Sequence, residues 1–185
     1  MRVRRPARAA LAILVLVAAL LAGSTAAAAV PLRDAQTVSV KVWSASVCKG
    51  FAIWEHKLTK LNSTGAADAT AAKAAIIRFL AGAAKATGRL ARTLKRAGVP
   101  SVKHGKEIAA TFVRSVKGLR VSYVEAKTAA AALPTGDPVA AQALTTQLQT
   151  AETTLHTAVS EAAKKYPAKK LDTAFATTKA CNDLS

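Results

Sequence analysis

The stretch VWSASVCKGFAIWEH, residues 42–56, decides how this chain folds. Its large apolar side chains recur every three or four residues, and the spacing continues on both sides, which is the pattern of one helix face. That face comprises Val40, Trp43, Val47, Phe51, Trp54, Leu58 and Leu61. The alternation of Val38, Val40 and Val42 would suit a short strand, but the longer helical period outweighs it. The turn-forming residues NSTG at 62–65 predict where the helix ends.

The helical period returns through the rest of the chain. A second helix is expected from about Asp68 to Ala97, with Gly98 just past its end. Its core face comprises Ile76, Leu80, Ala83, Thr87, Leu90 and Leu94. Further helices are expected from after Ser101 to Pro134, from Pro138 to Tyr166, and, as a short fifth helix, from about Lys169 to Asp183. Four long helices with short connections predict an all-α, up-down-up-down four-helix bundle.

The N-terminus has the three-part order of a secretory signal peptide. Residues 1–29 contain four arginines, then an uncharged apolar run from Ala9 to Ala22, then small residues with cleavage sites after Ala28 or Ala29. The apolar run is shorter than the ~20 residues that span a bilayer. We therefore expect an exported, cell-envelope-associated domain over residues 30–185, without a transmembrane span. The alternative is an uncleaved membrane anchor, because the alanines up to Val30 lengthen the apolar run.

Cys48 lies beside the apolar face of the first helix, and Cys181 is the other cysteine in the chain. A catalytic thiol needs a nearby base, and His56 lies two helical turns away. A metal site needs more ligands than two sulfurs. An even pair of cysteines in an exported chain indicates a disulfide. We expect it to tie the short fifth helix to the first, closing a long loop worth roughly 5 kcal/mol at most.

Two short motifs carry a resemblance. VWSASVCKGFAIW lies near the expected mature N-terminus, and AFATTKACNDL lies close to the end of the chain. Together they resemble small secreted actinobacterial proteins that are alanine-rich and helical, with an early cysteine near tryptophan and a late cysteine. The resemblance implies a disulfide-closed helical domain and transfers no catalytic residue.

Motifs for chemistry are missing from the sequence. It contains no GxGxxG, GxxxxGK[ST], HExxH, CxxC or GxSxG. Glu152 and His156, four residues apart, are the best metal-ligand pair, but no matching pair occurs on another helix. The ten acidic residues are scattered singly. We therefore expect a non-enzymatic protein with no catalytic residue, metal or cofactor. The alternative is an enzyme whose centre is assembled from distant residues.

Positive charge is concentrated in the middle of the chain. The net charge of +17 falls to +13 without the four arginines of residues 1–29. Thirteen basic residues lie between positions 69 and 127, opposed only by Glu107 and Glu125. Five of them recur at intervals of 7, 4, 3 and 4 residues, which places them on the outer side of the second helix. This basic stripe is Arg78, Lys85, Arg89, Arg92 and Arg96. A second cluster contains Lys164, Lys165, Lys169 and Lys170.

These charges suggest a function. A solvated face that keeps an alanine-rich protein in solution is one interpretation. A surface for anionic lipid headgroups or wall polymers is the other, and the one we adopt as a prediction. Nucleic acid fits poorly, because the chain is expected outside the cytoplasm and offers few exposed aromatic rings for stacking. An alternative function is transport of a small apolar ligand held between helices at Trp43, Phe51 and Trp54.

Overall fold

The computed structural model describes residues 36–61, 67–137 and 164–182, with residues 142, 146, 149, 150, 153, 157 and 160 between them. All of them belong to one compact unit, Leu32–Ser185. The predicted signal peptide lies outside the described residues. So does the predicted fourth helix, apart from the seven separate residues and residues 164–166; the seven residues and residues 164–165 are helical.

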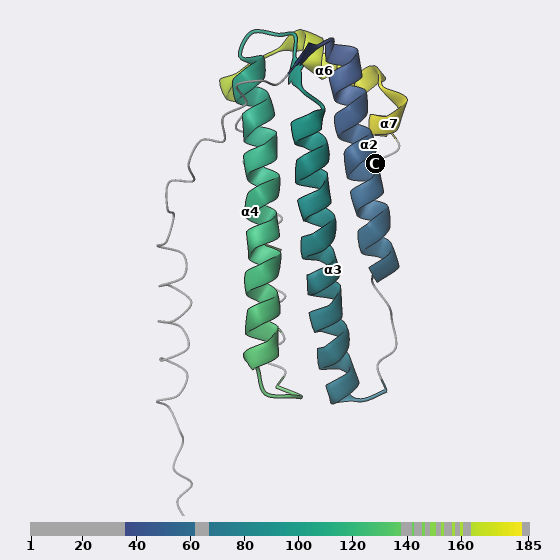
Figure 1. Ribbon diagram of the computed structural model, residues 1–185, viewed down its shortest axis with the longest axis vertical. Helices are drawn as coiled ribbons and strands as arrows, with labels where there is room; N and C mark the ends of the chain where they lie inside the picture. Colours follow the sequence, from purple (N-terminus) through teal and green to yellow (C-terminus); the bar gives the residue numbers. More distant parts are fainter. Residues whose placement is uncertain are drawn as a thin grey trace, which may run out of the picture. The chain divides into compact units, whose positions relative to one another are not determined.

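Three long helices form the described part of the bundle: α2 (Val40–Leu61), α3 (Ala69–Arg96) and α4 (Gly105–Ala132). They lie side by side in Figure 1. Consecutive helices run in opposite directions. The indole N–H of Trp43, near the start of α2, donates to the carbonyl of Gly98, just past the end of α3. The ammonium group of Lys73, early in α3, donates to the carbonyl of Leu133, just past the end of α4. The predicted all-helical character is confirmed in these helices.

The start and end of α3 follow from local chemistry. The Asp68 carboxylate accepts a hydrogen bond of 2.8 Å from the backbone N–H of Ala71, which makes Asp68 the N-cap of α3. Past the end of the helix, Gly98 adopts a φ of +81°, a region that glycine enters without steric cost. The chain therefore turns sharply after α3.

That turn creates a small parallel ladder that the helical period did not predict. Strand β1 (Thr37–Val38) pairs with strand β2 (Val99–Pro100). The backbone N–H of Val99 donates to Gln36, and that of Ser101 donates to Val38, each over 2.9 Å. The alternating valines therefore did indicate a strand, but the strand is short and ends before α2 begins at Val40.

Two clusters of buried side chains make up the core of the described residues. The first joins α2, α3, α4 and the C-terminal segment around Trp43, Leu90, Val113 and Leu171. The second joins α3 and α4 around Leu80 and further residues: Ala83, Ala84, Leu119, Tyr123, Ala126 and Ala130. Alanines at this contact let the two helices approach closely.

The prediction of the core face of α3 was wrong at one residue. Ile76 is 39% exposed, whereas its neighbour Ile77 packs against the second cluster. Counting back from the buried Leu80, steps of three and four residues both preserve a helix face, and they lead to different isoleucines. The choice depends on the neighbouring helix, which the periodicity of one helix does not specify.

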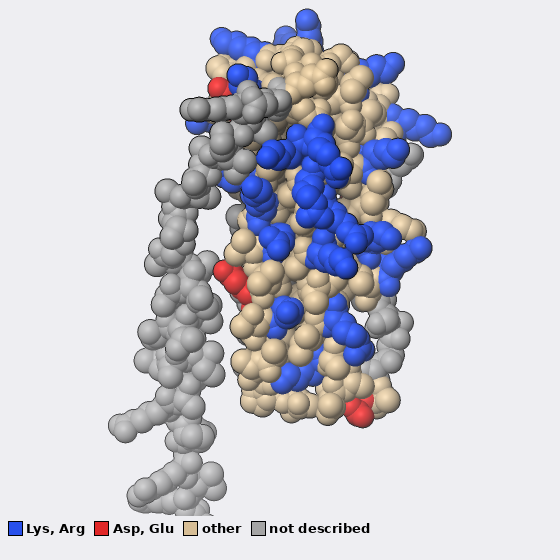
Figure 2. All heavy atoms as spheres, in the orientation of Figure 1, with Lys and Arg blue, Asp and Glu red and all other residues tan. Residues whose placement is uncertain are grey.

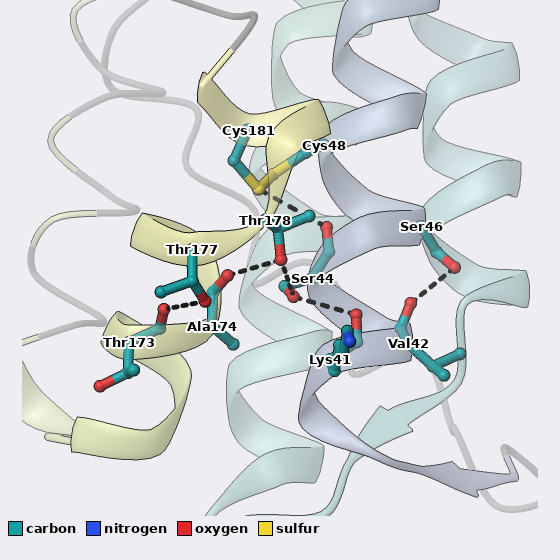
Figure 3. The surroundings of a disulfide bond; sticks show 10 residues. All are labelled: Lys41, Val42, Ser44, Ser46, Cys48, Thr173, Ala174, Thr177, Thr178 and Cys181. Carbon is teal, nitrogen blue, oxygen red and sulfur yellow. Dashed lines mark hydrogen bonds between the residues drawn. A yellow bond between two sulfur atoms is a disulfide. The ribbon is translucent and has the colours of Figure 1, made fainter.

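The C-terminal segment also departs from expectation. The single fifth helix predicted over 169–183 is divided into α6 (Lys169–Thr177) and α7 (Lys179–Asn182). Thr178 between them is extended, and its hydroxyl donates to the carbonyl of Ala174 over 2.6 Å. It lies 3.2 Å from the buried hydroxyl of Ser44 on α2 (Figure 3). The break therefore lies where the segment is attached to α2.

Within the described residues, no helix combines the length and the apolar character needed to cross a membrane.

Two glycines that differ in backbone conformation give a matched prediction. A Cβ at Gly98 would collide with the carbonyl oxygen of Gln36, and its φ is positive. We expect Gly98→Ala to lower the free energy of unfolding by about 1–3 kcal/mol. Gly118 lies inside α4, and a Cβ there meets nothing within 4 Å. We expect Gly118→Ala to raise the same quantity by about 0.5–1 kcal/mol. Urea unfolding of both variants checks the opposite signs, and equal effects would contradict the assignment of the turn.

Candidate anion-binding surface

The basic stripe lies on the outer side of α3. The five side chains named for it are all exposed, whereas residues one or two positions away, such as Leu80, Thr87 and Leu90, are buried. From Arg78 to Arg96 the stripe covers 18 residue-to-residue steps, or about 27 Å at the ~1.5 Å rise per residue of an α-helix. The helix contains no Asp or Glu to offset it. The predicted outward orientation of the stripe therefore agrees with the burial of its neighbours.

Helix α4 adds a cation that the stripe did not include. A Cβ at Gly88 would lie 3.1 Å from Nε and 3.2 Å from Cδ of Arg120, so the Arg120 side chain lies across α3 at this glycine. Gly88 directly precedes Arg89 in the stripe. Any larger residue at position 88 would have to displace the arginine. The missing Cβ thus brings a guanidinium from α4 to the middle of the α3 stripe.

Further basic side chains extend this surface along α4. Arg114, Lys117 and Arg120 follow one another at three-residue intervals and are exposed. We call the stripe together with these three residues the basic face. Figure 2 shows Lys and Arg side chains gathered over α3 and its neighbours on one side, with few acidic ones on the same view. The three-residue interval was the signal that could have found the α4 contribution, but only the contact at Gly88 reveals that it joins the α3 stripe.

The aromatic residues considered as a ligand pocket pack against each other and against neighbouring helices. Trp43 is 1% exposed. Its ring meets that of Phe112 edge-on at 5.4 Å and that of Phe175 at 5.9 Å. Phe51 and Trp54 are half-buried and meet edge-on at 6.2 Å. Aromatic rings at these distances fill space and stabilise the core.

The half-buried Trp54 also satisfies a buried hydroxyl. Its indole N–H donates to the Thr87 hydroxyl over 3.0 Å, and that hydroxyl donates to the carbonyl of Ala83 over 2.8 Å. Thr87 has no exposed surface, so it needs these partners. The tryptophans thus have structural roles in helix packing.

The predicted disulfide is confirmed. Cys48 on α2 and Cys181 on α7 are bonded, with their Cα atoms 4.9 Å apart. Cys48 is buried, and Cys181 is partly exposed. Figure 3 shows the bond beside the hydroxyls of Ser44 and Thr178. Both cysteines are therefore committed to a structural link in this state.

The described residues show no grouping of three or more His, Cys, Asp or Glu side chains that could hold a metal ion. Glu152 and His156, the best metal-ligand pair in the sequence, lie outside the described residues.

The basic face is an extended array of cationic side chains, which attracts anions with several charges.

Comparisons of the chain with protein-family models, with curated proteins and with solved structures found no match.

Proposed function

We propose that this chain is a non-enzymatic exported helical-bundle protein that associates electrostatically with anionic cell-envelope components through its basic face. The observation that carries the proposal is the outward stripe on α3, joined at Gly88 by Arg120 of α4. An elongated array of this length matches a polymer or a membrane surface with repeated negative groups better than it matches a single small ion.

Export is part of the proposal. The signal peptide predicted over residues 1–29 supports it, and so does the disulfide, because disulfides persist mainly in oxidising compartments outside the cytoplasm. In such compartments the abundant anionic partners are acidic lipid headgroups and charged wall polymers. We expect the surface to act by adhesion, without insertion into lipid, because Ile76 is the one large apolar side chain exposed on α3.

We also propose that residues 138–163 form a fourth long helix that completes an up-down-up-down bundle. Their apolar positions recur at three- and four-residue intervals. Among the described residues, the hydroxyl of Thr146 donates to the carbonyl of Gln142, and that of Thr150 donates to Thr146, as helical threonines do. This segment contains no Lys or Arg. A fourth helix there would add no positive charge, so the charge of the basic face comes from α3 and α4.

The experiment is co-sedimentation of the purified protein with isolated cell envelopes and with phosphatidylglycerol vesicles. We expect binding at low salt and release at high salt, since salt screens exposed charges. Each basic residue near an anionic surface contributes about 1 kcal/mol, so neutralising four arginines should lower the affinity at least about tenfold. The variant replaces four stripe residues by glutamine: Arg78, Arg89, Arg92 and Arg96.

A matched control removes the same amount of charge elsewhere. It replaces four exposed lysines of α2 by glutamine: Lys41, Lys49, Lys57 and Lys60. Both variants lose four positive charges, so a difference between them reports where the charges lie. Equal retention of the stripe variant and the wild type would refute the proposal, and equal losses in the two variants would refute the role of α3.

A further inference from the structure

A hollow of about 640 Å³ lies at the end of the bundle where α3 ends and α4 begins. One wall is the connection from β2 into α4, residues 99–107, and the other is the segment 167–170 that leads into α6. Small-molecule sites in proteins have volumes of about 300–1,000 Å³, and this hollow falls in that range. Its lining contains no residue of the basic face and none of Trp43, Phe51 and Trp54.

The lining of the hollow is strongly basic. Lys103 and Lys106 come from one wall, and Lys169 and Lys170 come from the other. Glu107 is the single carboxylate in the lining, and His104 is a further titratable group there. The two lysine pairs are more than sixty residues apart in the sequence, so the fold alone brings them together. A concave surface with four cations and one anion concentrates positive potential.

Three of the four lysines lie in the first turn of a helix, which in each case also contains one carboxylate, Glu107 in α4 and Asp172 in α6. Lys106 lies in the first turn of α4, and Lys169 and Lys170 lie in the first turn of α6. A helix N-terminus carries partial positive charge, so cations there are unfavourable. Neither helix has a side-chain hydrogen bond at its N-cap. A bound anion would relieve this repulsion, which makes ligand-dependent stabilisation an expected property of the hollow.

The walls are held in a fixed arrangement. The backbone of His104 has a φ of +60°. Its ring lies against the ring of Tyr166, with 5.2 Å between the ring centroids, and this contact links the two walls. Leu171 directly follows the second wall, residues 167–170, and is buried in the first core cluster. A Cβ at Gly105 would collide with the carbonyl oxygen of Pro100, so the chain packs against β2 without a gap. The backbone of the two walls is therefore in place before a ligand binds, and the exposed lysine side chains become ordered on binding.

We propose that this hollow is a binding site for a phosphoryl group carried by a small polar molecule. The four lysines supply the charge that recognises the phosphoryl oxygens, and the volume leaves room for an attached polar group. This inference goes beyond the proposed function, because the site is discrete and none of its lysines belongs to the basic face.

The test uses the full protein and the ring-proton NMR signals of its three histidines, at constant pH and ionic strength with chloride as the reference anion. The probes are inorganic phosphate and glycerol 3-phosphate, with glycerol as the neutral control. We expect a saturable shift of the His104 signals and no comparable shift at His56, which is exposed on α2. Glycerol should shift neither. Absence of a saturable phosphate-dependent shift at His104 would overturn the proposal.

Variants locate the site. Lys103→Gln combined with Lys169→Gln removes one exposed cation from each wall, and we expect at least about tenfold weaker binding of glycerol 3-phosphate. The matched control, Lys57→Gln with Lys60→Gln on α2, should bind as the wild type does. The stripe variant described above should also retain the His104 response, so failure of the basic face and failure of this site are distinguishable. Equal affinities in the pocket and control variants would overturn the assignment.

A second readout and a second arm complete the test. Glycerol 3-phosphate should raise the melting temperature of the wild type and not that of the pocket variant, and an equal rise in both would count against the site. If the phosphoryl group comes from lipid, phosphatidylglycerol vesicles will compete with glycerol 3-phosphate for the His104 response. If it comes from a soluble ester, the vesicles will leave that response unchanged. Either result supports phosphoryl recognition and identifies its source.

Discussion

Replacing Cys48 by Ala together with Cys181 by Ser is expected to lower the free energy of unfolding by about 2–5 kcal/mol. The bond closes a loop with a sequence separation of 133 residues, and opening it gives the unfolded chain many more conformations. At roughly 2–4 °C for each kcal/mol in a domain of this size, the melting temperature should fall by about 4–20 °C. Thermal unfolding followed by circular dichroism measures both quantities.

The disulfide also holds α7 against α2. Helix α7 has four residues and none of them is buried, so it has little packing energy of its own. Helix α6 is better anchored, through Leu171 and the contact of Phe175 with Trp43. Loss of the bond should therefore release α7 first, and hydrogen exchange should rise there before it rises in α6.

Two controls separate loss of the bond from the substitutions themselves. The wild type treated with a reductant should melt like the double variant. The double variant should not respond to the reductant. If neither reduction nor substitution changes the melting temperature, the disulfide contributes nothing to stability and the explanation of the C-terminal segment fails.

Trp43→Ala is the second large effect, with an expected loss of about 3–5 kcal/mol. The side chain is 1% exposed and links α2 to α4 through Phe112 and to α6 through Phe175. Its removal leaves a cavity where three elements meet. It also leaves the carbonyl of Gly98 without the indole donor that held it at 3.1 Å. The measurement is urea unfolding monitored by circular dichroism.

The control for Trp43 lies on the same helix. Ile53 is 53% exposed, and Ile53→Ala should change the free energy of unfolding by no more than about 0.5 kcal/mol. Trp43→Phe should fall between the two, because it retains a ring but not the hydrogen bond. A loss for Trp43→Ala as small as that for Ile53→Ala would contradict a packing role and favour the apolar-ligand carrier.

Much of the described structure could be predicted from residues that are close in sequence. The spacing of apolar residues indicated α2, α3 and α4, and the turn-forming residues at positions 62–65 of the sequence indicated where α2 ends. Asp68 and Gly98 marked the ends of α3 through capping chemistry that involves only the nearest turn. The outward orientation of the stripe followed from the same period. The pairing of Cys48 with Cys181 followed from the even number of cysteines.

Contacts between distant segments decided the rest, because helical periodicity describes one helix at a time. It did not distinguish Ile76 from Ile77, since both steps from Leu80 suit a helix face. The break at Thr178 lies at a contact with Ser44, which is 134 residues away in the sequence. Arg120 joins the α3 stripe only because Gly88 lacks a side chain. The lysines of the hollow meet only because β2 and α6 lie at the same end of the bundle, and no pattern along the chain encodes that meeting.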